Sequence, residues 1–251
     1  MTSRRSDSPP AWLDFFRNLA VALLFAVGIR TALAEPFHVP SPSMEPTLLV
    51  GDFMLASKFS YGYSRYSLPF GLGGFSGRIM ERPAERGDIV VFRLPRDPQV
   101  DYVKRVIGLP GDRIQVTGGT LYINDEIVPS ERIADFQAVD EAGRIVAIPR
   151  YLETLPGGNR HQILHVASIG PLDDTREFVV PPGHYFVMGD NRSNSLDSRV
   201  PAWMGGVDFV PAENLVGRVD LRHLSVDPAT TWSDPQSWFK AIRFDRIGLV
   251  G

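Results

Sequence analysis

Hydrophobic positions follow two different patterns along this chain. A charge-free run covers residues 18–29, and beyond it short apolar segments alternate with glycine, proline and charged residues. A Gly-Asp pair precedes three of these segments, at 53–59, 89–94 and 113–116. Glycine and aspartate favour turns, whereas β-branched and aromatic residues favour strands. The pattern therefore predicts a mainly β chain behind an N-terminal helix.

The N-terminal run predicts a membrane anchor. Twelve helical residues cover about 18 Å, whereas the hydrocarbon core of a bilayer measures about 30 Å. Residues 12–34 are long enough if Asp14 and Arg17 lie among the inner headgroups and Arg30 reaches outward. The arginines before the run favour a cytoplasmic N-terminus. We expect a short cytoplasmic segment, 1–11, then one transmembrane helix, with the remaining chain outside the cytoplasm.

Two other interpretations of this segment stay open. A buried amphipathic helix or the core of a signal peptide has a similar composition. Residues 32–34 read Ala-Leu-Ala before Glu35, which resembles the small-residue pattern of a signal-peptide cleavage site. Arg30, so close to that bond, argues against cleavage between Ala34 and Glu35.

Composition narrows the classes of function. At 251 residues and 43% hydrophobic, the chain can bury a sizeable core. The net charge of -3 gives no electrostatic case for nucleic acid. The absence of cysteine excludes a thiolate nucleophile, a thiolate metal site and a disulfide.

The first stretch with candidate chemistry lies just past the apolar run. Ser41 and Ser43 flank Pro42, and Pro46 follows. Prolines restrict their own backbone and that of the preceding residue, so we predict a rigid, extended segment. A rigid segment suits a nucleophile, but loop composition alone equally describes an ordinary linker.

The second stretch is residues 101–112, which contains Lys104 and Arg105 among apolar neighbours. Strand alternation places these two cations on opposite faces, so at least one of them should be partly buried. Burial lowers the pKa of a lysine, which makes it a candidate base. An edge-strand lysine that reaches solvent is the alternative.

The third stretch, residues 188–199, is a polar turn after an apolar segment. Its oxygens could suit calcium, but Arg192 and Arg199 argue against a bound cation. His161 and His165 have the spacing of a zinc-protease helix, yet Gln162 stands where glutamate is required. We expect no metal and no cofactor.

Together, and in this order behind an N-terminal anchor, the three stretches resemble the boxes of bacterial type I signal peptidase. The resemblance runs from about residue 35 to the C-terminus. It implies that Ser43 is the nucleophile and Lys104 the neutral general base, and that Ser195 orients the lysine. The Ser41 side chain and the Ser43 backbone N–H would form the oxyanion hole. Many family members carry glycine where this chain has Pro42, which makes the role of Ser41 less secure.

The resemblance also implies supporting and substrate-binding residues. Asp190, Asp197 and Arg199 would hold the third stretch by ion pairs. Substrates would be exported preproteins, cleaved after an Ala-x-Ala type sequence. The residues aligned with the shallow pockets for those small side chains are Phe37, Val39, Met44, Leu48, Tyr102 and Val103.

The expected architecture is an antiparallel β catalytic domain, 35–112 and 181–251, with an inserted β subdomain, 113–180. The expected partners are signal peptides and the lipid bilayer, without nucleic acid, and the chain should be a monomer. It would lie in the bacterial inner membrane with its catalytic domain on the periplasmic side. The aromatic segment 59–75, joined by Trp232, Trp238 and Phe239, either packs in the core or lies at the membrane interface.

Other functions fit these residues less well. A self-cleaving repressor with the same dyad needs a DNA-binding domain, and only about ten residues precede the predicted anchor. A triad that uses His184 would need that histidine beside Ser43, and a structural role at a strand entry suits it better. A binding module without activity would lack Ser43 or Lys104. A related peptidase dedicated to one substrate stays open.

Overall fold

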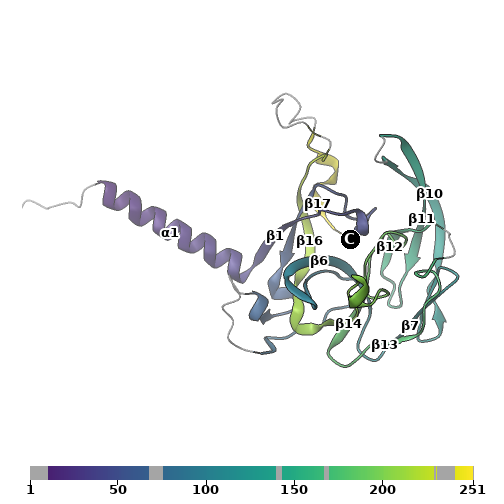
Figure 1. Cartoon of the computed structure of the whole chain (residues 1–251). Helices are drawn as coiled ribbons and strands as arrows, with labels where there is room; N and C mark the ends of the chain where they lie inside the picture. The colour runs from purple at the N-terminus through teal and green to yellow at the C-terminus, as the bar shows by residue number, and fades with distance from the viewer. Residues whose placement is uncertain are drawn as a thin grey trace, which may run out of the picture.

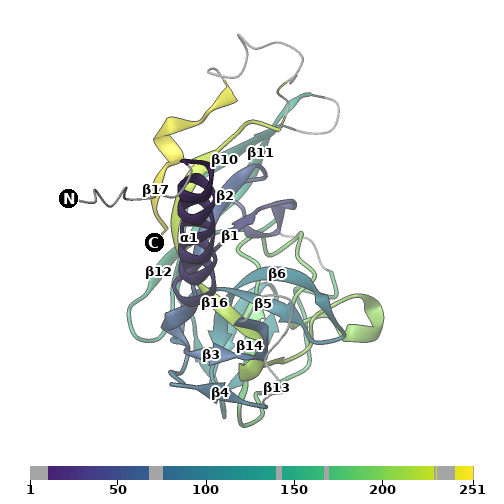
Figure 2. The same cartoon turned by 90° about the vertical axis from the view of Figure 1, so that its left-hand side faces the viewer.

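The computed structural model describes residues 11–67, 76–139, 143–166, 170–228, 230 and 241–250. Among these residues one long helix, α1 (Ala11–Ala32), projects from a body built mostly of strands (Figure 1). Figure 2 looks nearly along the axis of this helix, with the sheets behind it. The prediction of a mainly β chain behind an N-terminal helix is confirmed.

The largest sheet is antiparallel, with eight strands in the order β1-β2-β16-β5-β6-β14-β15 and with β17 beside β16. Strands far apart in sequence are neighbours in it, since β16 lies between β2 and β5. Its strands are β1 (Ala34–His38), β2 (Asp52–Ser57), β5 (Ile89–Leu94), β6 (Asp97–Gly108), β14 (His184–Met188), β15 (Val210–Pro211), β16 (Leu215–Ser225) and β17 (Gly248–Leu249).

Three smaller sheets complete the fold. All described strands between residues 113 and 179 belong to two of them, and the Gly118-Gly119 turn joins β7 to β8. One contains β10 (Ser130–Val139), β11 (Ile145–Thr154) and β12 (Arg160–Leu164); another contains β13 (Phe178–Val179), β7 (Arg113–Thr117), β8 (Thr120–Ile123) and β9 (Glu126–Ile127); the last contains β3 (Tyr63–Ser64) and β4 (Arg78–Ile79). The 3-10 helices are η1 (Pro42–Met44), η2 (Lys58–Ser60), η3 (Arg65–Ser67), η5 (Ala202–Met204), η6 (Ala212–Asn214) and η7 (Phe244–Arg246).

Two buried clusters hold the parts together. Ile107 and Phe186 of the main sheet pack with Ile114 and Phe178 of the small sheet, and the two phenylalanine rings lie 5.1 Å apart. A second cluster places Met44 in contact with the main sheet, and its side chain is 0% exposed. Because apolar burial contributes about 25 cal/mol per Å², Met44 anchors the segment that carries the two serines.

The serine-containing segment differs from its predicted extended form. Ser41 is extended, with φ -135° and ψ 154°, but Pro42–Met44 forms the 3-10 turn η1. Pro42 keeps only the residue before it, Ser41, out of the helical region. Its own fixed φ suits the first position of a helical turn. The turn is as well fixed as an extended segment would be, since both Ser43 and Met44 are buried.

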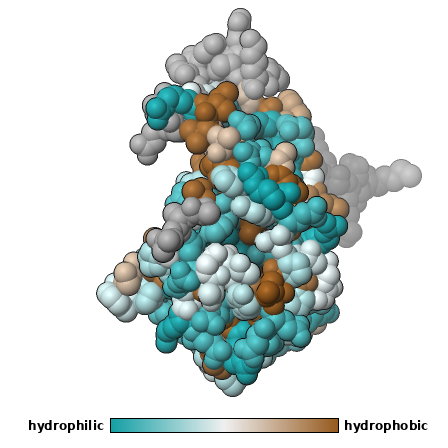
Figure 3. Space-filling model, turned by 90° about the vertical axis from the view of Figure 1, so that its right-hand side faces the viewer, coloured by the Kyte–Doolittle hydropathy of each residue, from teal (hydrophilic) through white to brown (hydrophobic). Residues whose placement is uncertain are grey.

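None of the helices in the described part of the chain is both long enough and apolar enough to cross a bilayer. The side chains of α1 are nevertheless mostly apolar and exposed, and Asp14 pairs with Arg17 at 3.0 Å. By contrast, polar residues cover most of the face that is turned away from α1 (Figure 3). The bond between Ala34 and Glu35 lies within β1.

The predicted aromatic segment divides into different environments. Tyr61 is buried, and its hydroxyl donates to Asp88 Oδ2 at 2.8 Å. Phe59 is 48% exposed. Residues 68–75, like Trp232, Trp238 and Phe239, lie outside the described residues. Of these two aromatic side chains, Tyr61 packs in the core and Phe59 lies at the surface.

Candidate active site

A cleft of about 810 Å³ opens along the main sheet. Its walls come from β1, from the serine-containing turn and from the N-terminal half of β6, together with Asn194 and Leu196 of the loop after β14. Ser43 and Lys104 both line it. The first two stretches singled out in the sequence therefore meet in one cavity.

The side chains of Ser43 and Lys104 are in direct contact. Lys104 Nζ lies 2.7 Å from Ser43 Oγ and donates a second hydrogen bond to the Val103 carbonyl oxygen at 3.0 Å. Both side chains are largely withdrawn from solvent, since Lys104 is 3% and Ser43 8% exposed. A nucleophile and a base require this separation, about 2.6–3.2 Å.

Burial changes the proton affinity of Lys104. Loss of hydration disfavours the charged ammonium and lowers the pKa of Lys104 to about 8, although Asp197 and Asp190 act in the opposite direction. A substantial fraction of the side chain is then neutral near physiological pH. The amine can therefore accept a proton, which an exposed lysine does poorly.

Two candidate oxyanion donors lie at the same place. Ser41 Oγ is 3.3 Å from Ser43 Oγ, and Ser41 is exposed to the cleft. Ser43 is the second residue of the turn η1, a position whose backbone N–H has no acceptor within the turn. Both groups are thus available to a carbonyl oxygen that reaches Ser43.

The third stretch fixes the nucleophile from the other side. The backbone N–H of Asn191 donates to the Ser43 carbonyl oxygen at 3.1 Å, and its side-chain amide donates to the Pro42 carbonyl oxygen at 3.2 Å. Gly189 packs so closely that an added Cβ would lie 2.4 Å from the Ser43 carbonyl oxygen. Only glycine allows this approach.

Buried ion pairs hold this stretch in place. Arg105 binds both oxygens of Asp190, at 2.8 and 2.7 Å, and Thr47 Oγ1 donates to the same carboxylate at 2.5 Å. Arg199 pairs with Asp197 at 2.9 and 2.8 Å. Burial alone raises the pKa of each carboxyl, but the paired arginine outweighs it and the net shift is downward. Lys104 and Arg105 are both buried, one facing Ser43 and the other Asp190.

The structure does not show the expected hydrogen bond between Ser195 and Lys104. Its side chain is buried, but its hydroxyl has no hydrogen-bond partner among the described residues. Lys104 Nζ instead contacts Ser43 and the Val103 carbonyl oxygen. The orienting role of Ser195 stays a prediction.

The six expected substrate-binding residues divide into two groups. Phe37, Tyr102 and Val103 line the cleft. Val39, Met44 and Leu48 are at most 1% exposed and lie in the core beneath it. Their side chains point inward because they anchor the backbone of β1 and of the serine-containing segment. In this structure these three side chains lie outside the lining of the cleft, and their part in substrate binding stays a prediction.

Comparison with known proteins places this chain in a family. A family described as signal peptidase, peptidase S26, matches residues 12–224. The chain belongs to that family. It is therefore a serine endopeptidase.

Two relatives from the genus Rickettsia agree with this assignment. Signal peptidase I of Rickettsia typhi is 38% identical over 92% of this chain and 91% of its own length. Signal peptidase I of Rickettsia canadensis is 38% identical over 98% of this chain and 94% of its own length. A solved signal peptidase I from Enterococcus faecalis V583 is 27% identical, covers 55% of this chain and 97% of its own, and superposes with a TM-score of 0.33.

The structure adds residues to this peptidase site that sequence reasoning missed. Arg192 is buried and binds both oxygens of Glu153 in β11, with Nη1 at 2.7 Å and Nη2 at 2.5 Å. This pair ties the loop that contacts Ser43 to the three-stranded sheet. Arg192 stood within the third stretch, but nothing in the sequence around Glu153 indicated its partner.

The remaining histidine candidates have other surroundings. His161 lies in the strand β12, not in a helix, and His165 follows that strand and pairs with Asp173 at 2.8 Å. Residues four apart in a strand are separated by about 13 Å, too far for one metal ion. His184 Nδ1 lies 2.9 Å from the Pro182 carbonyl oxygen at the start of β14.

Proposed function

We propose that this peptidase removes N-terminal signal peptides from exported preproteins with Ser43 as nucleophile and neutral Lys104 as general base. The observation that carries the proposal is the 2.7 Å contact between Lys104 Nζ and Ser43 Oγ inside a cleft. A serine hydroxyl is a weak nucleophile until an adjacent base takes its proton. Among the described residues, Lys104 is the only basic side chain within hydrogen-bonding distance of Ser43 Oγ.

The reaction follows from these positions. Ser43 Oγ attacks the scissile carbonyl carbon while its proton passes to Lys104 Nζ. The Ser41 hydroxyl and the Ser43 N–H stabilise the negative oxygen, a contribution of about 3–4 kcal/mol in comparable sites. The Lys104 ammonium then gives its proton to the departing amine. The same lysine, neutral again, activates the water that hydrolyses the acyl-enzyme.

The hydrogen bonds that the neutral Lys104 amine needs give Ser195 a role in orienting it. A neutral lysine has two hydrogens and one lone pair, and the lone pair must face the Ser43 hydroxyl during attack. The Val103 carbonyl oxygen takes one hydrogen, at 3.0 Å. The second hydrogen needs an acceptor, and the buried, unpartnered hydroxyl of Ser195 supplies one after rotation of its side chain.

Two free strand edges face the cleft and suit an extended substrate. β1 is the terminal strand of the main sheet. Residues 99–103 of β6 lie in the part of that strand that does not pair with β14, which contacts only positions 105–108. Main-chain hydrogen bonds to these edges would hold a signal peptide, with alternate side chains entering the cleft. Phe37, Tyr102 and Val103 line the cleft with apolar surface, which supports binding of the small apolar side chains of an Ala-x-Ala site.

Cleavage of a preprotein with an Ala-x-Ala site, by the purified full chain in neutral detergent, tests this specificity. We expect one cut directly after the second alanine, mapped by mass spectrometry of the mature product. Replacing that alanine by leucine should lower kcat/KM by about a hundredfold or more, because a subsite that fits alanine excludes the larger side chain. A substrate change far from the cleavage site is the matched control and should have no effect.

Equal cleavage of the alanine and leucine substrates would contradict Ala-x-Ala specificity. No cleavage of several ordinary preproteins would favour a peptidase dedicated to one substrate.

We further propose that the N-terminal segment that contains α1 anchors the peptidase in the inner membrane, with the N-terminus in the cytoplasm and the catalytic domain in the periplasm, although α1 alone does not meet the requirements for a spanning helix. The support is the exposure of large apolar side chains along α1, which the β body leaves uncovered: Trp12, Phe15, Phe16, Val21, Leu23, Leu24 and Phe25 are all more than half exposed. Uncovered apolar surface of this extent requires another apolar phase. A scissile bond near the bilayer surface would give the anchor its purpose.

Membrane extraction tests the anchor. The wild-type chain should remain in the membrane pellet after an alkaline wash. Arginines at Leu24 and Phe25, which are 72% and 70% exposed, should release it, because each buried arginine costs about 2.5–3.5 kcal/mol. The matched control places arginines at the exposed Ile145 and Val146 of β11 and should stay in the pellet. Release of the wild-type chain would rule the anchor out.

Residues 113–180 are proposed to form an inserted subdomain that supports the site without taking part in the chemistry. All its strands lie outside the main sheet. It is connected to the catalytic loop by the buried pair of Glu153 and Arg192 and by backbone hydrogen bonds from Leu164 to Asp190 and from Arg192 to Leu164.

A further inference from the structure

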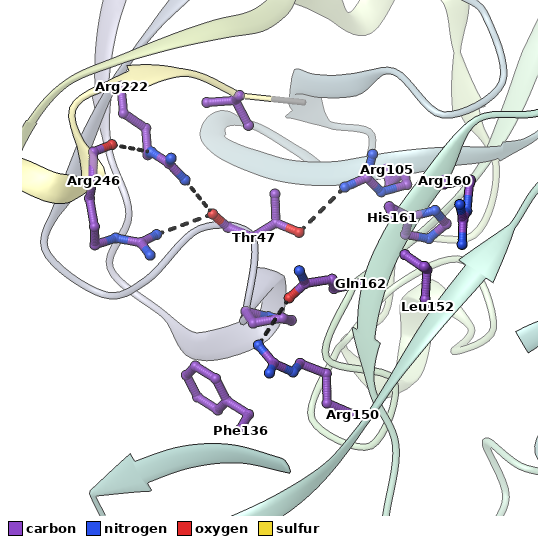
Figure 4. A pocket seen from close by; sticks show the side chains of 12 residues that line it. Thr47, Arg105, Phe136, Arg150, Leu152, Arg160, His161, Gln162, Arg222 and Arg246 are labelled. Atoms are coloured by element: carbon purple, nitrogen blue, oxygen red, sulfur yellow. Dashed lines mark hydrogen bonds between the residues drawn. The ribbon is translucent and has the colours of Figure 1, made fainter. Parts of the chain in front are cut away.

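A second cavity, of about 370 Å³, lies beside the segment that follows the nucleophile (Figure 4). Thr47 reaches into it, and strands β11, β12 and β16 contribute to its walls. None of the residues that line it is acidic, whereas five are arginines: Arg105, Arg150, Arg160, Arg222 and Arg246.

Only two of these five arginines have a carboxylate partner. Arg105 pairs with Asp190 at 2.7 Å, and Arg246 pairs with Asp52 at 2.7 Å. Within the part of the chain that the structure describes, Arg150, Arg160 and Arg222 form no ion pair. Three positive charges around one cavity therefore have no carboxylate in direct contact, although Asp52 and Asp245 act on Arg222 from farther away.

Two of the guanidinium groups are also crowded together. Arg222 Nη1 and Arg246 Nη2 both donate to the Thr47 carbonyl oxygen, at 2.8 and 3.2 Å (Figure 4). Burial and the neighbouring Arg246 lower the pKa of Arg222. Like charges held this close repel each other, and an anion between them would relieve the repulsion.

A buried imidazole in the same wall has unused hydrogen-bonding capacity. His161 is 6% exposed, and Nδ1 has no hydrogen-bond partner among the described residues. Its Nε2 lies 3.4 Å from Glu153 Oε2 without forming an aligned hydrogen bond. A buried polar atom without a partner is unfavourable, and a ligand in the cavity would give it one.

We propose that this cavity binds an oxyanion of the phosphate type, either a phosphodiester headgroup or a free phosphate. Guanidinium groups bind phosphate oxygens through two parallel hydrogen bonds, and several of them converge here without carboxylate competitors. The volume falls at the lower end of the range for ligand sites, about 300–1,000 Å³. Such a ligand would contact the same Thr47 whose hydroxyl binds Asp190, and so lie next to the segment that carries Ser43.

Calorimetric titration of the purified full chain in neutral detergent tests the proposal. The ligands are inorganic phosphate and a short-chain phosphatidylglycerol, with short-chain phosphatidylcholine for comparison. Arg160→Gln is the variant, because the Arg160 side chain is exposed and makes no hydrogen bond to any described residue, so its loss leaves the fold intact. Arg82→Gln removes an equally exposed arginine away from the cavity and serves as the control.

We expect saturable binding of phosphate or of phosphatidylglycerol, weakened about tenfold by Arg160→Gln and unchanged by Arg82→Gln. Binding of phosphatidylglycerol but not phosphatidylcholine identifies an anionic lipid headgroup as the ligand, and binding of inorganic phosphate alone identifies a free phosphate. The proposal is overturned if neither ligand binds at millimolar concentration, or if Arg160→Gln and Arg82→Gln weaken binding equally. Signal-peptide cleavage is not part of this readout, so its failure would leave this result standing.

Discussion

Replacement of Lys104 by alanine is expected to lower kcat/KM for preprotein cleavage by about a thousandfold or more, with little effect on substrate binding. The reason is the loss of the only base in contact with Ser43 Oγ among the described residues. Ser43→Ala should lose a similar factor. The double variant should be no worse than either single one, because a nucleophile without its base and a base without its nucleophile fail alike.

A conservative variant separates proton transfer from simple packing. Lys104→Arg keeps a long cationic side chain, but a guanidinium stays protonated at every accessible pH. We expect it to be as inactive as Lys104→Ala while the protein remains folded, as measured by thermal unfolding. Near-normal cleavage by either variant would mean that another group acts as the base.

The pH dependence of kcat/KM tests the same role of Lys104 in the wild-type enzyme. Burial lowers the pKa of Lys104 to about 8, and only the neutral amine can act as base. kcat/KM should therefore rise about tenfold per pH unit below that value and level off above it. A profile that is flat through this range would exclude a titrating lysine. kcat/KM must rise with pH, because raising the pH removes the proton that blocks the Lys104 amine.

The largest effect on stability is expected at the pair of Glu153 and Arg192. Glu153→Ala should lower the free energy of unfolding by about 3–5 kcal/mol, because it leaves the buried Arg192 guanidinium without its carboxylate. The loss should also reduce cleavage, since the backbone of Arg192 accepts a hydrogen bond from Arg199 and its loop holds the Ser43 carbonyl oxygen. Denaturant unfolding of the full chain measures the first effect and preprotein cleavage the second.

Removing both partners is the control for this pair. Glu153→Met combined with Arg192→Met buries no charge and should recover most of the lost stability. If Glu153→Ala is as stable as the wild type, the buried ion pair between Glu153 and Arg192 is contradicted. Acid should act in the same direction: the pKa of Glu153 is lowered to about 2, so its contribution is complete above pH 4.5 and declines as the pH falls towards 2.

The amino-acid sequence by itself determined much of this protein. Its Gly-Asp turns placed β2, β5 and β7, because turn chemistry and strand propensity are local properties. The spacing within the three polar stretches identified the family and predicted Ser43 and Lys104 as nucleophile and base. Strand alternation also required at least one of Lys104 and Arg105 to be buried, since neighbouring side chains in a strand face opposite sides.

Only the tertiary structure decided which of these parts meet. Ser43 and Lys104 are 61 residues apart, and Arg105 and Asp190 are 85 apart, so their contacts depend on how the sheet is assembled. Local patterns contain no signal for Glu153, whose partner lies on another element, nor for the arginine cavity, whose walls come from separate strands. The inward orientation of Val39, Met44 and Leu48 was likewise decided by packing. Long-range burial has no local signature, because it depends on the surface that each side chain finally meets.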